Sequence, residues 1–475
     1  MDSDNISTTP SLPMIAATAV ATTIATLVVG KKYLYPRRDP VILSPLTAVR
    51  LGKIPSAVAE DLEHGPDEFP GARDVNTPYG SIRTYEFGPS SGKKILFIHG
   101  ISTSAMTLTR LANSFVASNH RVLLFDLFGR GFSDTPSDLP HDSRLYLTQI
   151  LLALASSPLS WMGTNGLAVI GYSMGGALAV SFATTFPHLV ESLVLLAPAG
   201  LIRSENFGLA SRLMFQSGYV PPRLLEAVTR KRLRKPLAGS VKKSNNNGNG
   251  SGTGGANAPE VPSSGIKRNP TGPGHVGDEA IAFAEGETLN PPSSSGAPPS
   301  STKISQLPAA QKGSSYPPSS PSPLPSSPYA LSSDPLEQAV AKYVHWMLDH
   351  HQGFVPAFVG CIASAPLTGQ QQLWAKLGDQ IRSARPDYFP AGVIVLLGRE
   401  DQIVDAEDYG EDGKLLLDIG PGRDGDEKVV VDEKLVWQVV GGGHNFPMTN
   451  ANEALEVIYR KWGVEPPERE DGTTR

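Results

Sequence analysis

From about residue 81 onward, short apolar runs alternate with segments in which apolar residues recur at helical spacing. Continuous apolar strands are typical of a parallel sheet, because helices cover both of its faces. We therefore expect an α/β fold with a mostly parallel sheet and helices on both faces. The expected strands are 81–87 (an early edge strand), 94–98, 121–125, 167–170, 191–197, 393–397 and 435–440. The expected helices are 104–118, 144–156, 176–186 and 454–462.

The alternation stops between residue 200 and about residue 388. Residues 201–237 and 336–385 have helical character, and they stand between two expected strands of the sheet. We expect them to form a helical cap over the sheet edge. Inside this insertion, residues 239–332 consist largely of Ser, Gly and Pro, a composition that buries too little apolar surface to offset the entropy of ordering. We expect a disordered insert there.

The same pattern divides the chain into segments. We expect an N-terminal membrane anchor at 1–35, a tether at 36–78, the first part of the core at 79–200, the cap at 201–388, the second part of the core at 389–464 and a loose charged tail at 465–475.

The anchor is inferred from residues 12–30, which carry no charge and are rich in Ala, Val, Ile, Leu and Thr. As a helix they would span about 28 Å, close to the thickness of a bilayer's hydrocarbon core. Acidic residues precede the segment and basic residues follow it, so the positive-inside rule places the C-terminal side in the cytosol. We expect a single-pass membrane protein, by default of the endoplasmic reticulum. The mitochondrial outer membrane, a lipid droplet and an apolar disordered tail are the alternatives.

Composition narrows the function. The chain has 475 residues and a formal net charge of −5, which argues against a nucleic-acid partner because there is no basic excess to neutralise phosphates. Cys361 is its only cysteine, so no intramolecular disulfide can form, and a reducing compartment is the simpler interpretation. Its apolar surroundings predict a buried, inert thiol.

Gly171-Tyr172-Ser173-Met174-Gly175 fits the G-x-S-x-G pattern of a nucleophile elbow. An expected strand precedes it and an expected helix follows it, which is the context that this motif requires. Ser173 is therefore the candidate nucleophile, placed at the tip of a sharp turn whose flanking glycines let backbones pass closely.

A serine nucleophile needs a base, and the base needs a carboxylate that orients it. In this architecture the acid and then the base follow the serine along the chain. Asp401 and His444 come directly after two expected strands, where catalytic groups gather in parallel sheets, and are the candidate acid and base. Glu400 and Asp405 are the rivals of Asp401.

The developing oxyanion needs two backbone donors. The amide of Met174, directly after the nucleophile, is one candidate. The amide of Ile101, in the loop after strand 94–98, is the other. We expect His99 to shape this loop and to take no part in proton transfer.

These motifs together resemble the α/β-hydrolase fold superfamily, in the branch with a helical cap. The resemblance is carried by His99-Gly100, the D-x-x-G-x-G-x-S element from Asp126 to Ser133, the elbow from Gly171 to Gly175, Asp401 and His444. It implies hydrolysis of an ester, amide or thioester through Ser173, without a metal or organic cofactor. Asp126 is expected to cap its turn, a structural role.

An anchored, capped hydrolase is similar to membrane-bound monoacylglycerol-lipase-like members, which implies a small apolar ester or an acyl lipid as substrate. The long insert and the acidic stretch 405–433 depart from that pattern. Serine aminopeptidases and C–C bond hydrolases share the scaffold and remain alternatives. A further alternative is a membrane-tethered interaction protein that recruits partners through the proline-rich run 316–329. The basic cluster 230–235 is either a contact for anionic headgroups or a solvated helix end.

Overall fold

A computed structural model describes residues 12–35, 38–55, 65–163, 166–203, 220–234, 334–383, 389, 391–418, 428–432 and 434–467. The expected insert 239–332, with its proline-rich run 316–329, and most of the expected tail lie outside the described residues.

A central sheet organises the described part of the chain, with strands in the order β10-β11-β9-β8-β7-β4-β5-β3-β2. Its strands are β2 (Ala72–Thr77), β3 (Gly80–Phe87), β4 (Lys94–Ile98), β5 (Arg121–Phe125), β7 (Leu167–Tyr172), β8 (Val190–Leu196), β9 (Gly392–Gly398), β10 (Lys428–Asp432) and β11 (Leu435–Val440). Every pairing from β11 through β5 is parallel, and the pairings nearer the two edges are antiparallel. The mostly parallel α/β sheet expected from the sequence is confirmed.

Both edges of the sheet differ from expectation. At one edge, β10 lies inside the acidic stretch 405–433, where no strand was expected, and pairs with β11. β3 is not an edge strand, because it pairs with β5 on one side and with β2 on the other. β2 lies within the expected tether, as do α2 (Pro45–Arg50) and β1 (Val41–Ile42), which pairs with β6 (Thr135–Pro136). β2 contains a single strongly apolar residue, Val75, and none of its residues is fully buried. An edge strand of this kind has no hydrophobic period for a sequence pattern to reveal.

Helices cover both faces of the sheet. α4 (Thr109–Ala117), which follows the 3₁₀ helix η1 (Ala105–Leu108), packs with α15 (Ala451–Trp462) on one face. α5 (Ser143–Ala155), α6 (Met174–Thr185) and α12 (Gln371–Arg382) cover the other, and η2 (Pro187–Leu189) follows α6. α12 falls within the expected cap, yet it packs against α6 and α13 (Ala406–Leu416) and so belongs to the layer that covers the sheet.

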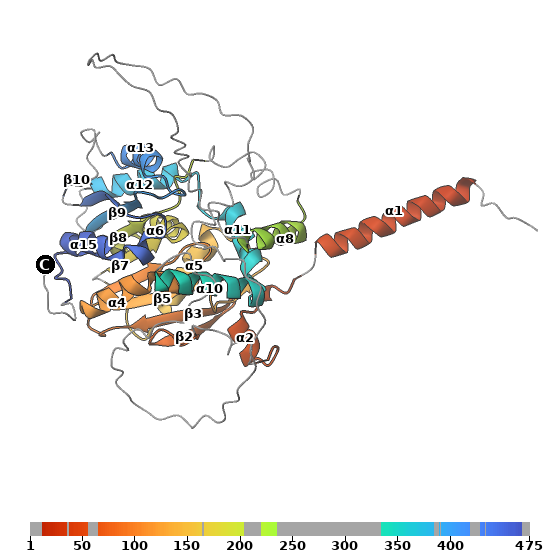
Figure 1. Ribbon diagram of the computed structural model, residues 1–475, viewed down its shortest axis with the longest axis horizontal. Coiled ribbons are helices and arrows are strands. Elements are labelled where there is room, and N and C mark those ends of the chain that lie inside the picture. The colour runs from red at the N-terminus through yellow and green to blue at the C-terminus, as the bar shows by residue number, and fades with distance from the viewer. Residues whose placement is uncertain are drawn as a thin grey trace, which may run out of the picture.

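The cap comprises α8 (Pro222–Leu233), α10 (Pro335–His350) and α11 (Phe354–Ser364), which lie between β8 and β9 along the chain. α8 and α11 pack together at one side of the molecule (Figure 1). α10 contacts η1 and α14 (Phe446–Thr449), which follow the carboxyl ends of β4 and β11. The cap therefore lies over the edge of the sheet at which the candidate catalytic residues were expected.

The N-terminal segment forms α1 (Leu12–Leu34), which projects away from the sheet (Figure 1). Its C-terminal end lies beside α8, where the Arg223 guanidinium is 4.9 Å from the ring centre of Tyr33. Among the described residues, no helix combines the length and the apolar character needed to cross a membrane. The expectation of an anchor at 12–30 is therefore not supported, because the alanines and threonines of this helix make it only moderately apolar.

Candidate active site

Ser173 occupies the sharp turn between β7 and α6. Its backbone has φ 54° and ψ −121°, a conformation that residues other than glycine rarely adopt. The turn is fixed on both sides: the Ser173 amide donates to the Leu196 carbonyl at 3.0 Å, and the Ser173 carbonyl accepts from the Ala199 amide at 2.9 Å. The side chain is thereby presented at the carboxyl end of the central strands.

The two glycines of the elbow are required by close backbone contacts. A Cβ atom at Gly171 would lie 2.3 Å from the Gly175 carbonyl oxygen. One at Gly175 would lie 2.1 Å from the Ile98 carbonyl oxygen, at the end of β4. Distances this short exclude a side chain, so the elbow packs directly against the start of the loop that contains His99 and Ile101.

The structure brings Ser173, His444 and Asp401 together from three loops. The Nε2 atom of His444 lies 2.9 Å from Ser173 Oγ, and its Nδ1 atom lies 2.8 Å from Asp401 Oδ2. All three residues are buried. The rivals of Asp401 are placed elsewhere, since Glu400 is exposed and the Asp405 carboxylate accepts from two amides at the start of α13.

Asp401 is itself held by the backbone. Its Oδ1 atom accepts hydrogen bonds from the amides of Ile403 and Val404, both at 2.8 Å. This leaves Oδ2 to accept from His444 Nδ1, which places the imidazole proton on Nδ1 and the lone pair of Nε2 toward Ser173. The arrangement has the tautomer that a general base requires.

The loop that carries His444 depends on glycines. Gly442 has φ 100°, which only glycine adopts without strain. The Gly442 carbonyl accepts from the Glu400 amide at 3.0 Å, and the Gly441 amide donates to the Glu453 carboxylate at 2.9 Å. The candidate base His444 is thus fixed both to the loop of Asp401 and to α15.

The two candidate oxyanion donors, Ile101 and Met174, are both buried. Within the described part of the chain, neither backbone amide donates to a protein acceptor. Buried amides are nearly always paired, so two free donors beside a candidate nucleophile fit a site that binds a substrate oxygen.

His99 fixes the orientation of one of these amides. Its Nε2 atom accepts from the Leu127 amide at 2.9 Å, so its Nδ1 atom carries the proton and donates to the Gly100 carbonyl at 2.8 Å. That carbonyl belongs to the same peptide plane as the Ile101 amide. Burial lowers the pKa of His99 to about 3, so the ring stays neutral and keeps this hydrogen bond near neutral pH.

Arg130 has a role in this loop that the sequence pattern did not reveal. It is fully buried, and its Nε atom donates to the Ile101 carbonyl at 2.8 Å. Its other nitrogens donate to Tyr146 and to the Sγ atom of Cys361 in the cap helix α11, at 2.9 and 3.3 Å. The sequence signal that could have revealed this role is the position of Arg130, a charged residue between the two glycines of the D-x-x-G-x-G-x-S turn.

Asp126 organises that turn. Its carboxylate accepts from the amides of Ala105 and Phe132, each at 3.0 Å, and from the Tyr85 hydroxyl at 3.1 Å. A Cβ atom at Gly131 would lie 2.2 Å from this carboxyl group, which explains the glycine. The contacts are all structural.

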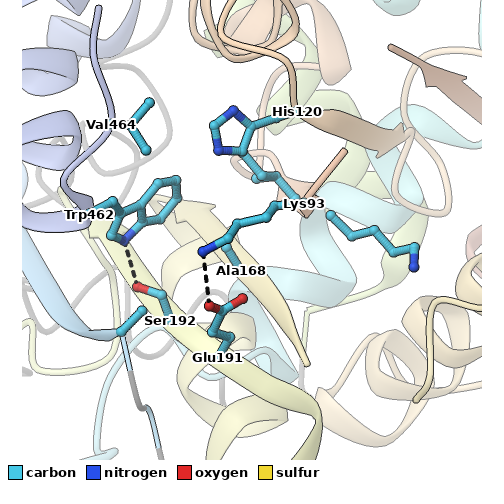
Figure 2. Close-up of a pocket in the computed structure, with 10 residues that line it drawn as sticks. Lys93, His120, Ala168, Glu191, Ser192, Trp462 and Val464 are labelled. Carbon is cyan, nitrogen blue, oxygen red and sulfur yellow. Dashed lines mark hydrogen bonds and ion pairs between the residues drawn. The ribbon is translucent and has the colours of Figure 1, made fainter. Parts of the chain in front are cut away.

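A separate pocket (Figure 2) lies at the end of the sheet where the parallel strands begin, opposite to the end that carries Ser173. Trp462 Nε1 donates to Ser192 Oγ at 2.9 Å there, and Lys93 pairs with Glu191 at 3.4 Å. Lys94 and Ala168 line this pocket near the starts of β4 and β7, whereas Ser173 follows the end of β7. In parallel strands these ends are far apart, so this pocket is not part of the candidate active site. Among the described residues, no group of His, Cys, Asp and Glu is arranged to hold a metal ion.

Comparison with known proteins finds relatives that match only part of this chain. A serine hydrolase-like protein of Danio rerio is 30% identical over 129 residues, which cover 27% of this chain and 38% of that protein. A human serine hydrolase-like protein is 28% identical over 131 residues, 27% of this chain and 62% of that protein. The matched segments therefore span less than two thirds of these relatives.

Among solved structures, a 2-hydroxy-6-oxo-6-phenylhexa-2,4-dienoate hydrolase from Rhodococcus is similar at TM-score 0.45 and 14% identity, covering 83% of this chain and 98% of that one. At these values the likeness adds no argument about function. The sequence model of the family described as alpha/beta hydrolase fold matches residues 93–451, most of the chain. The resemblance inferred from the motifs is thereby confirmed, and the protein belongs to the α/β-hydrolase fold family.

Proposed function

We propose that this protein is a serine hydrolase that cleaves carboxylic esters through a covalent acyl-enzyme. The observation that carries the proposal is the continuous chain of hydrogen bonds from Asp401 through His444 to Ser173, with distances of 2.8 and 2.9 Å. The serine hydrolase-like relatives are consistent with it.

In the first half of the reaction, His444 Nε2 takes the proton of Ser173 Oγ while the oxygen attacks the ester carbonyl. Asp401 stabilises the imidazolium that forms. The amides of Ile101 and Met174 bind the negative oxygen of the tetrahedral intermediate. When that intermediate collapses, His444 gives its proton to the departing alcohol, and the acyl group stays on Ser173.

In the second half, His444 takes a proton from a water molecule that attacks the acyl-enzyme. The same two amides bind the second oxyanion. Collapse releases the carboxylic acid and returns the proton to Ser173 Oγ, so the enzyme is regenerated.

Labelling with a fluorophosphonate probe tests the role of Ser173. We expect the unmodified chain to be labelled and to hydrolyse p-nitrophenyl butyrate, and Ser173→Ala to lose both activities, because the probe bonds to an activated serine oxygen. Ser160→Ala, at an exposed serine outside the site, is the matched control and should be labelled normally. Labelling that persists in Ser173→Ala would contradict the proposal.

The narrower part of the proposal is that the substrates are acyl lipids such as monoacylglycerols. It rests on the sequence resemblance to capped serine hydrolases, and not on the N-terminal anchor, which the structure does not support. A series of p-nitrophenyl esters and monoacylglycerols of increasing chain length tests it, and kcat/KM should rise with acyl length. A preference for amino-acid amides would favour an aminopeptidase instead, and turnover of a vinylogous diketone would favour a C–C bond hydrolase.

A further inference from the structure

Asn445, the residue that follows His444, is bonded to the cap. Its Nδ2 atom donates to the Oε1 atom of Glu337, in the first turn of the cap helix α10. Glu337 is only 6% exposed, so its carboxylate has lost most of its hydration. A carboxylate only accepts hydrogen bonds, and the Asn445 amide nitrogen only donates, so the direction of this bond is fixed.

The start of α10 is itself fixed to the core. Asp334 caps the helix by accepting from the amides of Leu336 and Glu337 at 2.9 and 3.2 Å. The same carboxylate forms a two-pronged ion pair with Arg110 of α4, at 2.7 and 3.0 Å. Paired contacts of this geometry are the strong form of an Arg–carboxylate interaction.

Arg110 completes the connection, because it also donates to the carbonyl of Met448 in α14. α14 begins two residues after His444. Glu337 in the first turn of α10 is therefore bonded to Asn445, and the capping residue Asp334 is connected through Arg110 to Met448. These contacts hold the two ends of the short segment 445–448, which directly follows His444.

We propose that Glu337 is a positioning residue for the hydrolytic reaction: through Asn445 it holds the loop of His444 so that Nε2 stays in line with Ser173 Oγ. The inference rests on the proposed function. The hydrogen bonds that connect this loop to α15 and to the loop of Asp401 are made by Gly441 and Gly442, before His444. The bond from Asn445 to Glu337 restrains the chain after His444. The cap thereby contributes to placing the base.

The expected effect is large because proton transfer depends steeply on distance. A hydrogen bond to a charged group is stronger than one between neutral groups. A displacement of about 1 Å in a catalytic group can lower the rate about 100-fold. Loss of the Glu337 acceptor leaves the Asn445 amide without its partner and releases the loop.

The test compares variants of the 475-residue chain on p-nitrophenyl butyrate. We expect Glu337→Ala to lower kcat by about ten- to 100-fold with KM within about twofold, because the base moves while substrate binding stays. The rate constant for fluorophosphonate labelling should fall by the same factor. Glu337→Gln keeps an acceptor oxygen for Asn445 and should retain most of kcat.

An exchange of the pair gives a second arm. Asn445→Asp places two carboxylates against each other and should lower kcat as Glu337→Ala does. The double variant E337Q/N445D restores a donor and an acceptor with the direction reversed, and should recover kcat. This arm decides the question if Glu337→Ala does not fold.

Asp349→Asn is the matched control. Asp349 lies on the same helix α10 and pairs with Arg234, at the end of the helix remote from His444. We expect its kcat to match that of the unmodified chain.

Two results would overturn the inference: a folded Glu337→Ala variant with unchanged kcat, or an exchange variant no better than Asn445→Asp alone. Failure of the proposed function is distinguishable from both, since it would show as turnover that survives Ser173→Ala.

Discussion

At the scale of the residue, each member of the site is held by a partner whose removal has a distinct consequence. Ser173 is held in a strained conformation, with φ at 54°, by backbone hydrogen bonds to Leu196 and Ala199. Asp401 is held by two amides through Oδ1 and uses Oδ2 for His444. Because one carboxylate oxygen binds the backbone and the other binds His444, a substitution at Asp401 can change the hydrogen bond to His444 while the backbone contacts remain.

Asp401→Asn should leave the fold intact and abolish most of the activity. The amide oxygen can still accept from Ile403 and Val404, but the amide nitrogen then faces His444 and donates to Nδ1. The imidazole proton moves to Nε2, which can no longer accept from Ser173. We expect kcat for an ester to fall by about 10⁴-fold with little change in KM.

Steady-state kinetics measures this, with the thermal midpoint as the control for folding. Asp405→Asn, at the start of α13, is the matched variant and should keep its activity. A variant at 401 with normal kcat would move the role of the acid to another residue.

At the scale of the element, the elbow is a joint between β7, α6 and the end of β4. Gly175 is the closest point of that joint, because its missing Cβ atom would stand 2.1 Å from the Ile98 carbonyl oxygen and 2.6 Å from that of His99. Both neighbours are backbone, so neither can move away as a flexible side chain would. The elbow and the loop of His99 and Ile101 are therefore in close backbone contact.

Gly175→Ala should separate these two elements. We expect a loss of about 1–3 kcal/mol in the free energy of unfolding, as for other overpacked sites, and a larger loss in kcat because the Ile101 and Met174 amides no longer converge. Urea unfolding and ester hydrolysis measure the two effects.

Gly410→Ala is the control for this substitution. Gly410 lies inside α13, and no atom beyond its chain neighbours and the backbone of its own helix lies within 4 Å of the position its Cβ atom would take. Alanine should raise the free energy of unfolding by about 0.5–1 kcal/mol there, since it favours helix. Equal effects at the two positions would contradict the close-contact argument.

At the scale of the whole molecule, three buried histidines couple folding to pH. Burial lowers the pKa of His99 and of His141 to about 3 and that of His351 to about 4. The rings of His141 and His351 bond through both nitrogens, as that of His99 does. They connect the loop of His99 and Ile101, α5 and the cap.

These histidines predict a loss of stability in mild acid. In the unfolded chain each binds a proton near pH 6.5, whereas in the folded chain each stays neutral down to about pH 3–4. The unfolded state therefore binds more protons in this window, so the free energy of unfolding falls as pH falls. The slope is about 1.4 kcal/mol per pH unit for each histidine.

Urea unfolding from about pH 7.5 to about pH 5 measures that slope. His141→Gln should reduce it by the contribution of one histidine, about 1.4 kcal/mol per pH unit, whatever its effect at neutral pH. Burial raises the pKa of the Asp126 carboxyl, and this group opposes the trend within its own titration range. A midpoint that stays constant over the measured range would contradict the prediction.

Much of this protein could be predicted from local pattern. Apolar runs identify the central strands because those strands are buried on both faces, and the G-x-S-x-G turn identifies Ser173 because few sequences satisfy its geometry. Chain order then pointed to Asp401 and His444, and the structure places His444 within hydrogen-bond distance of both Asp401 and Ser173. The edge strand β2 was missed because it carries a weak hydrophobic signal. The other edge strand, β10, was missed although it contains three consecutive valines, because this short run lies within the acidic stretch 405–433.

The sequence by itself determined the family and the order of the strands and loops, because burial and turn geometry act on neighbouring residues. Only the tertiary structure decided the contacts between remote residues. The bond from Asn445 to Glu337 joins positions 108 residues apart, and that from Arg130 to Cys361 joins positions 231 apart. No local propensity encodes such a pair: it forms when the packing of the cap on the sheet brings a donor next to the acceptor that satisfies it.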